Sequence, residues 1–369
     1  MVAALLHDSL FLLGYVAILL LWRSAPQKLS KHRQLTHRSS QGQTLKRSIV
    51  VLIPARNEAI RLPRLLAKRQ HPNDRMHYLV IDDHSYDQTA AVATAYGVDV
   101  LQAQELPSGW YGKSWACYQG ACATDEAWLI FLDADCLVEE QNLLDAVTWL
   151  AARRAIGYKE AVTVQPWHQV QSPPEQLSAF FNLVVWLGTV RNANKSYGGF
   201  GPCLIVHRED YQRVDGHRAI AVQLLEHHAL CCRLAQHGVT VTQWLGDASF
   251  SFRMHEGTLQ SVVQGWKKHI STGAKSTPRW RLLLIILLFC GAFSAFFITP
   301  LPFALLGYLS YALLFFLLFR QVGNFHPISA IAYPFWLLVF LLVFLVSQVS
   351  STQKVVWKDR TYEQDQERR

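Results

Sequence analysis

Short apolar runs and amphipathic stretches alternate between residues 48 and 165. Five runs have the length and composition of buried strands: 49–53, 78–81, 98–101, 128–132 and 161–165. Four stretches between them carry apolar residues at helical spacing: 58–70, 87–96, 114–124 and 139–155. The alternation predicts an α/β fold with a mostly parallel sheet and helices on both faces. Ligands of such sheets bind beyond the carboxyl ends of the strands.

Longer apolar runs lie at both ends of the chain. Residues 3–22 form the first, and three more follow the last amphipathic stretch: 282–299, 301–319 and 328–348. Each can cross the ~30 Å of hydrocarbon in a bilayer. We therefore expect an N-terminal membrane anchor over 1–22 and C-terminal transmembrane helices over 276–348. The positive charge follows the first run instead of preceding it, which favours an uncleaved anchor with its N-terminus outside over a secretory signal.

The net charge of +8 is concentrated beside these apolar runs. Seven Lys or Arg and no acid lie between Arg23 and Arg47, which predicts a basic juxtamembrane linker over 23–47. A second cluster precedes the next run: Lys267, Lys268, Lys275, Arg279 and Arg281. Such flanks mark the cytoplasmic side and attract anionic lipids. Nucleic-acid binding does not explain charges at membrane borders, so we expect a multi-pass cell-membrane protein with a cytoplasmic catalytic part and no nucleic-acid partner.

The number of spans conflicts with the polar tail over 349–369. With the catalytic part in the cytosol, four full crossings put this basic tail outside. One segment is therefore re-entrant or interfacial, or the orientation is reversed. The imperfect run 3–22 and the Pro-interrupted region 299–302 are the candidates.

The seven cysteines predict neither disulfides nor a metal centre. Their number is odd, no C-x-x-C is present, and no spacing typical of metal ligands occurs. We expect reduced thiols that pack as small apolar side chains.

Acidic residues follow three of the predicted strands. Asp133 and Asp135 end the run 128–132, and in extended chain residues i and i+2 share a side. Paired carboxylates suit Mg²⁺ or Mn²⁺ holding a diphosphate, although a solvated turn is the simpler interpretation of the pair alone. Pro54–Glu58 and Asp82–Asp83 end two other strands. Their convergence on one edge favours a site, and without a glycine-rich phosphate loop a nucleotide would be held by acids and metal.

Three motifs resemble family 2 inverting glycosyltransferases, which have a GT-A type nucleotide-binding domain. They are Val51-Leu52-Ile53-Pro54-Ala55-Arg56-Asn57-Glu58, Val80-Ile81-Asp82-Asp83-His84-Ser85-Tyr86-Asp87-Gln88-Thr89 and Asp133-Ala134-Asp135. The resemblance covers about 48–275 and implies a UDP-sugar donor. It implies that Asp83 contacts the uracil and that Asp135 carries the cation, supported by Asp133. The donor-binding residues that we expect are Pro54, Glu58, Asp82, Asp83, Lys113 and Asp133. Lys113 and Glu58 also have simpler interpretations, as an exposed lysine and a helix N-terminal charge.

Other segments resemble membrane-bound glycosyltransferases of C30 carotenoid glycoside synthesis. They are Pro107–Cys117, Phe200-Gly201-Pro202, Phe252-Arg253-Met254, Gln264–His269, Ser271–Ala274 and the tail motif Val356–Tyr362. The resemblance implies a lipid acceptor such as a C30 carotenoid carboxylic acid. It also suggests acceptor contacts from Phe200, Gly201, Gln264 and Trp266. Trp266 could instead be an aromatic anchor at the membrane interface.

The expected general base lies in Leu225-Glu226-His227-His228. The family usually has two acids here, the second acting as base, but His227 replaces the second. Glu226 is then the expected base and His227 its partner or substitute, with Asp135 the third catalytic residue. Glu226 could also be an ordinary first-turn helix acid. A carboxylate acceptor is already ionised near pH 7 and needs no strong base.

The sequence thus predicts an inverting glycosyltransferase that moves a sugar, glucose in our interpretation, from a UDP-sugar to a membrane lipid with Mg²⁺ or Mn²⁺. A ceramide or hopanoid glycosyltransferase and a polysaccharide synthase are the alternative enzymes. A nucleotide-binding membrane protein without activity is the alternative outside enzymes, and only the His227 substitution favours it.

Overall fold

The protein is described by a computed structural model over residues 2–29, 48–69, 75–193, 198–223, 225–254, 257–349, 354–357 and 360–363. It divides into two compact units. The first consists of Met1–Pro26, Trp167–Arg191 and Arg253–Ser351, and the second of Gln27–Pro166, Asn192–Phe252 and Thr352–Arg369. The catalytic domain expected over 48–275 therefore includes two segments, 167–191 and 253–275, that pack in the first unit.

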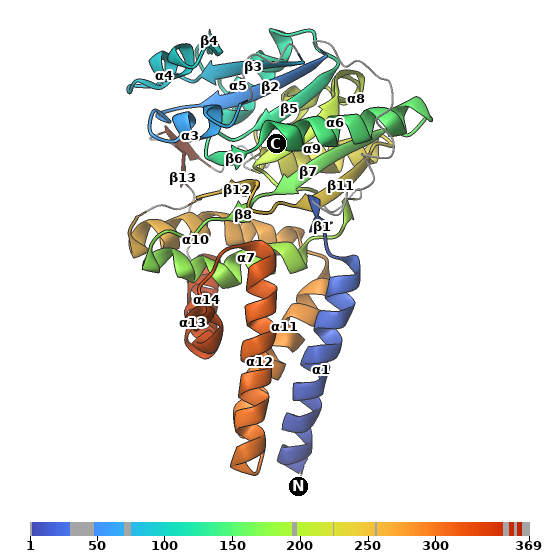
Figure 1. The fold of residues 1–369 in the computed structure, drawn as a ribbon, viewed down its shortest axis with the longest axis vertical. Coiled ribbons are helices and arrows are strands. Elements are labelled where there is room, and N and C mark those ends of the chain that lie inside the picture. The colour runs from blue at the N-terminus through green and yellow to red at the C-terminus, as the bar shows by residue number, and fades with distance from the viewer. Residues whose placement is uncertain are drawn as a thin grey trace. The chain divides into compact units, whose positions relative to one another are not determined.

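The second unit is built on a nine-stranded sheet in the order β1-β11-β7-β10-β5-β2-β3-β4, with β9 beside β11 (Figure 1). Its strands are β1 (Gln27–Lys28), β2 (Ile49–Ala55), β3 (Met76–Asp82), β4 (Asp99–Gln102), β5 (Trp128–Leu132), β7 (Glu160–Gln165), β9 (Asn192–Ala193), β10 (Cys203–His207) and β11 (Thr240–Leu245). β6 (Cys136–Val138) and β12 (Phe250–Phe252) pair outside it, as do β13 (Lys354–Trp357) and β14 (Arg360–Glu363). Its helices are α3 (Leu62–Leu66), α4 (Thr89–Ala95), α5 (Gly112–Cys122), α6 (Glu140–Ala155), α8 (Arg208–Arg213), η2 (Gly216–Ile220) and α9 (Glu226–Gln236).

Alternate strand residues build the core of this unit. Val50 and Leu52 of β2 and Leu129 and Phe131 of β5 share one face of the sheet, as the twofold period of a strand requires. Residues of α5 and α9 cover this face, among them the fully buried Cys117. The predicted α/β fold with a mostly parallel sheet is confirmed.

The acidic strand ends meet at one edge, as predicted. β2 pairs in parallel with β5 on one side and with β3 on the other. In this register Ala55 lies opposite Asp82, and the backbone N–H of Asp83 donates to the carbonyl of Ala55 at 2.8 Å. The carboxyl ends of three strands therefore open on the same side.

Two parts of the prediction for this unit differ from the structure. The helix expected over 58–70 is only Leu62–Leu66 within the described residues. Residues 58–61 form a turn before it, in which the backbone N–H of Glu58 donates to Thr89 Oγ1. The strands β10 and β11 were not predicted. β10 runs antiparallel to both β5 and β7, so its place depends on distant pairing that local sequence does not encode.

The first unit is helical. Its helices are α1 (Val2–Ser24), η1 (Pro173–Leu177), α7 (Ser178–Gly188), α10 (Leu259–Ser276), α11 (Arg279–Ser294), η3 (Ala295–Phe297), α12 (Leu301–Val322), α13 (Pro327–Ile331) and α14 (Tyr333–Val349), with the short strand β8 (Trp167–His168). Within this unit α1, α11 and α12 run lengthwise, and α7 and α10 lie across their direction (Figure 1). Among the described residues, three helices are long and apolar enough to cross a membrane: Leu6–Ser24, Arg279–Phe297 and Leu301–Val322.

The fourth expected span, 328–348, is wrong as a single helix. The chain there forms α13 and then α14, of which Tyr333–Gln348 is apolar but shorter than a spanning helix. Pro334 explains the interruption, since proline lacks the N–H that would continue a helix and is tolerated only in a first turn. The helix that is too short to span is therefore α14, and not the run 3–22 or the region 299–302 that the sequence analysis named as candidates.

Small residues let α1 and α11 approach closely. A Cβ added at Gly14 would lie 3.2 Å from the Cα of Gly291 and 2.1 Å from the Tyr311 hydroxyl. That hydroxyl donates to the carbonyl of Phe11 at 2.9 Å. Close backbone approach through glycine is the usual way in which apolar helices associate in lipid.

Arg281 has a different position from the one its basic cluster suggested. It is fully buried, and its guanidinium donates to the carbonyls of Leu187 and Leu21 and to Ser24 Oγ. These groups lie at the C-terminal ends of α7 and α1, where carbonyls have no partner within their own helix. Arg281 therefore ties three helix ends together and does not face lipid.

Candidate active site

A partly buried lysine contacts two acids from distant parts of the second unit. Lys113, in the first turn of α5, places its Nζ 2.6 Å from Asp133 Oδ1 and 2.6 Å from Glu226 Oε1. Asp133 follows β5, and Glu226 is the first residue of α9. Lys113 is not the exposed lysine of the simpler interpretation, and Glu226 is not an isolated first-turn acid.

The cluster shifts the pKa of each member. Burial raises the pKa of Asp133 to about 7; Lys113 opposes this rise, while Asp135 and Glu226 add to it. Burial also disfavours the charged form of Glu226, but the Lys113 ammonium, His227 and the hydrogen bonds to the carboxylate together outweigh burial and lower the pKa of Glu226 to about 2. The two acids hold the pKa of Lys113 well above its usual value in spite of burial. Glu226 is therefore ionised and strongly stabilised, which makes it a weak base.

The oxygen donors at this edge fit a hard divalent cation. Asp133 and Asp135 flank a turn between β5 and β6, and the N–H of Cys136 donates to the carbonyl of Asp133 at 3.1 Å. The carboxylate of Asp135 contributes to the raised pKa of Asp133, so a positive charge between them would relieve their repulsion. Carboxylate oxygens are the ligands that Mg²⁺ and Mn²⁺ prefer.

Arg56 connects the loops that follow β2 and β3. Its guanidinium donates to the carbonyls of Asp83 and His84 and to the Tyr86 hydroxyl. Asp83 is fully buried. The sequence analysis did not single out Arg56, although an arginine directly after a strand that ends at the ligand edge was a usable signal.

The remaining donor-side candidates support this loop in the described structure. The carboxylate of Asp82 accepts from the N–H of Ser85 at 3.2 Å, Glu58 is buried with its N–H on Thr89 Oγ1, and Pro54 lies within β2. These contacts fix the backbone between β3 and α4. The structure thus brings Pro54, Glu58, Asp82 and Asp83 to one edge.

His227 does not take the position expected of a substitute base. Its Nδ1–H donates to the carbonyl of Gly201, and its side chain is completely buried. Burial and the neighbouring Lys113 lower the pKa of His227 to about 4, so the ring is neutral. Phe200 is also buried, and its carbonyl accepts from Thr163 Oγ1 at 2.7 Å. This placement supports a positioning role for His227, not proton transfer.

The acceptor candidates on α10 belong to the first unit. Trp266 is buried, its ring stacks on Phe181 with centroids 4.7 Å apart, and its Nε1 donates to Ser178 Oγ at 2.9 Å. This packing contradicts the expectation that the indole stacks on an acceptor. The residue is only 3% exposed, so it does not lie at the membrane surface as the interfacial-anchor alternative requires. Gln264 is exposed.

Comparison with known proteins gives consistent matches. The model of Glycosyl transferase family 2 matches residues 50–204. A 4,4'-diaponeurosporenoate glycosyltransferase of Staphylococcus haemolyticus is 36% identical over 335 residues, covering 85% of this chain and 88% of that protein. The enzyme of the same name from Staphylococcus aureus strain MRSA252 is 31% identical over 333 residues, covering 86% and 88%.

A solved structure supports the fold. The mannosyltransferase PcManGT from Pyrobaculum calidifontis, in complex with GDP-Man and Mn²⁺, superposes with a TM-score of 0.50 over 93% of this chain and 99% of that chain. At 15% sequence identity the likeness concerns the fold alone.

Proposed function

The chain belongs to glycosyl transferase family 2, and from this premise we propose that it transfers glucose from UDP-glucose to a C30 carotenoid carboxylic acid. The names of the relatives with 36% and 31% identity support an acceptor of this kind. The observation that carries the proposal is the contact between Lys113 and Glu226. It leaves the only acid at the expected position of the base with a pKa of about 2.

The weak base fits a carboxylate acceptor. A general base is most effective when its pKa lies near the working pH, and Glu226 is far below it. An alcohol must lose a proton as it attacks, whereas a carboxylate has already lost it. Among the acceptors considered, the carotenoid acid is the one whose attack depends least on proton removal by Glu226.

The reaction balances without a proton acceptor. A carboxylate oxygen of the lipid forms a bond to the anomeric carbon, and the bond from that carbon to the diphosphate oxygen breaks. The electron pair leaves with UDP. Attack from the face opposite the leaving group inverts the anomeric centre, so an α-linked donor gives a β-glucosyl ester.

The chain's own residues supply charge and position on the donor side. Among the described residues Lys113 uses two of its three N–H donors, on Asp133 and Glu226, which leaves the third for a phosphate oxygen. Asp135 with Asp133 would hold a Mg²⁺ or Mn²⁺ ion, which when bound offsets the charge of the leaving diphosphate. Asp83, Glu58 and the loop fixed by Arg56 would receive the nucleoside.

Three crossings would remove the conflict over the tail. If α1 enters the membrane from outside and α11 and α12 cross out and back, residues after α12 return to the cytoplasmic side of the catalytic domain. The shorter α14 then lies at the interface. The ring centroids of its Phe340 and of Phe181 in α7 are 4.9 Å apart, which supports a position of α14 beside α7.

Sugar transfer in isolated membranes tests the proposal. Membranes containing the protein are incubated with labelled UDP-glucose, Mn²⁺ and one of three acceptors: the C30 carotenoid acid, a ceramide or a hopanoid. The expected product is a labelled carotenoid that releases glucose on mild alkaline treatment, because an ester is cleaved and a glycoside is not. Alkali-stable label, or preferred transfer to ceramide or hopanoid, contradicts the acceptor. UDP binding with no transfer to any lipid would favour the inactive binding protein.

A further inference from the structure

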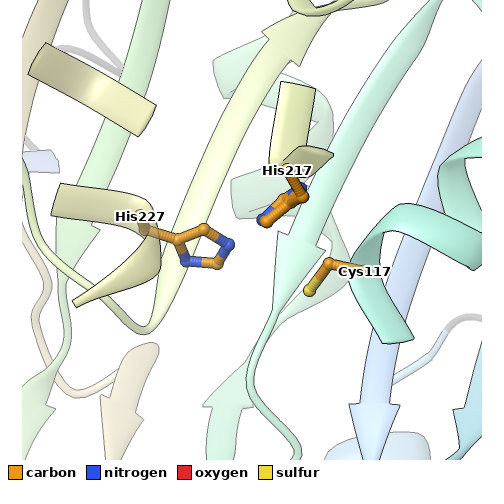
Figure 2. A group of neighbouring side chains, drawn as sticks. All are labelled: Cys117, His217 and His227. Atoms are coloured by element: carbon orange, nitrogen blue, oxygen red, sulfur yellow. The ribbon is translucent and has the colours of Figure 1, made fainter. Parts of the chain in front are cut away.

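Three side chains with metal-ligating atoms meet in the interior of the second unit. Cys117 comes from α5, His217 from η2 and His227 from α9. One ligand atom of each lies within 4.8 Å of the other two, and all three residues are fully buried. Figure 2 shows the two imidazole rings and the thiol turned toward one another.

In both histidine rings Nδ1 has a hydrogen-bond partner, and Nε2 is the atom that faces the cluster. Nδ1 of His227 is bonded to the carbonyl of Gly201, and Nδ1 of His217 lies 3.0 Å from the Tyr211 hydroxyl. Neither Nε2 atom has a hydrogen-bond partner among the described residues, although both are buried. Buried polar atoms of this kind usually have one. Metal-ligating histidines commonly use their second nitrogen in this way, on a carbonyl or another oxygen.

We propose that Cys117 Sγ, His217 Nε2 and His227 Nε2 bind a thiophilic divalent cation such as Zn²⁺. One thiolate and two imidazoles are ligands that Zn²⁺ takes in tetrahedral sites, and hard cations such as Mg²⁺ prefer oxygen. Binding draws the three atoms together and releases the thiol proton to solvent, since the thiolate is the ligand. The sequence did not indicate this site, because the three ligands come from separate elements and no motif joins them.

The cluster lies directly behind the proposed active site. Cys117 is one helical turn after Lys113 in α5, and His227 follows Glu226 in α9. A cation there fixes the two helix ends that carry the Lys113–Glu226 ion pair. Its role is positional, and it is distinct from the oxygen site at Asp135. The inference is independent of the sugar and acceptor proposed above.

Aromatic packing is the competing explanation. The Phe131 ring lies 4.7 Å from the His217 ring and 5.7 Å from the His227 ring, so the histidines could be neutral members of an apolar cluster. In that case no metal binds, and a serine at Cys117 changes nothing but packing.

Cobalt spectroscopy with metal analysis decides between them. The full-length protein in detergent is freed of metal with a chelator and titrated with Zn²⁺ or Co²⁺. We expect one Zn²⁺ per chain retained after gel filtration, and with Co²⁺ a sulfur-to-cobalt charge-transfer absorption. Both should persist in Asp135→Ala, which removes the oxygen site.

Cys117→Ser should lose the charge-transfer absorption completely, and His217→Gln should lose retained zinc. Cys122→Ser, an exposed cysteine on the same helix, is the matched control and should keep both. Folded wild-type protein that retains no zinc and shows no charge-transfer absorption overturns the proposal. An absorption that persists in Cys117→Ser also overturns it. The wild-type measurement decides even where a variant does not fold.

Discussion

Lys113 lies 2.6 Å from Glu226, so the residue expected to remove a proton from the acceptor is instead held in an ion pair. The same ammonium contacts Asp133 of the acidic turn at 2.6 Å. The Lys113 ammonium therefore pairs with one acid on the donor side, Asp133, and with one on the acceptor side, Glu226. Substitutions at these three positions should separate binding from chemistry.

Glu226→Gln should reduce transfer to a carotenoid acid by less than about 10-fold, because a carboxylate nucleophile has no proton to lose. Loss of a true general base costs ~10²–10⁴-fold. The measurement is kcat with the carotenoid acid, together with UDP affinity to show that the site is intact. A fall of 10²-fold or more with unchanged UDP affinity would contradict the carboxylate mechanism.

Lys113→Met should weaken UDP binding by about 10–150-fold, the equivalent of one charge-assisted hydrogen bond of ~1.5–3 kcal/mol. It also removes the charge that lowers the pKa of Glu226, so that pKa should rise. Calorimetric titration with UDP measures the affinity, and Lys113→Arg, which keeps the charge, is the control. Equal affinity in wild type and Lys113→Met would show that the lysine only pairs the two acids.

Asp135→Ala should abolish metal-dependent transfer, whereas Asp133→Ala should mainly raise the KM for UDP-glucose. The difference follows from our assignment of the cation to Asp135, with Asp133 contacting the donor or supporting the metal. Mn²⁺ titrations of activity at saturating donor separate the two effects. The same defect in both variants would show that the acids share the ion equally.

The strand ends were predictable because each depends on local sequence. The runs 49–53, 78–81 and 128–132 stop at Pro54, Asp82 and Asp133, and parallel pairing then places these strand ends together. Lys113 was identified from its glycine-rich segment, but its contact with Glu226 requires α9 to lie beside α5. No local pattern encodes that pairing.

Other contacts were missed because the residue type suggested something else. Arg281 belongs to a basic cluster beside an apolar run, which is typical of a lipid-facing residue, yet it serves buried carbonyls. Trp266 lies in a segment that resembles an acceptor-side segment of related enzymes, but it fills the interior of the helical unit. Burial overrides the preference of a single side chain when several helix ends or rings converge on it.

Acid should destabilise the first unit through Glu175. Its carboxylate accepts from Arg253 Nη2 at 2.5 Å and from the N–H of Gln171 at 2.8 Å. Burial opposes ionisation of Glu175, but these donors outweigh it and lower its pKa below the usual 4.5. A lowered pKa means that this stabilisation is complete above about pH 4.5 and is lost as pH falls through the lower folded value.

The Tm of the full-length protein in detergent, at one scan rate, should therefore fall more steeply below pH 4.5 in wild type than in Glu175→Gln. The variant should already be less stable at pH 7, by ~1.5–3 kcal/mol for the lost charged hydrogen bonds. Asp99→Asn, at an exposed carboxylate of β4, is the control and should follow the wild-type profile. Parallel profiles for wild type and Glu175→Gln would mean that Glu175 does not titrate on unfolding.

Three crossings place the C-terminal tail on the same side as the catalytic domain, and four place it opposite. A single cysteine introduced by Ser351→Cys in a cysteine-free chain should therefore react with a membrane-impermeant maleimide only in permeabilised cells. Leu301 is the first residue of α12, at the other end of the proposed hairpin, so Leu301→Cys should react in intact cells. Labelling of both positions in intact cells would require α14 to cross the membrane despite the break at Pro334. The tail motif would then face outside, away from the Lys113–Glu226 site.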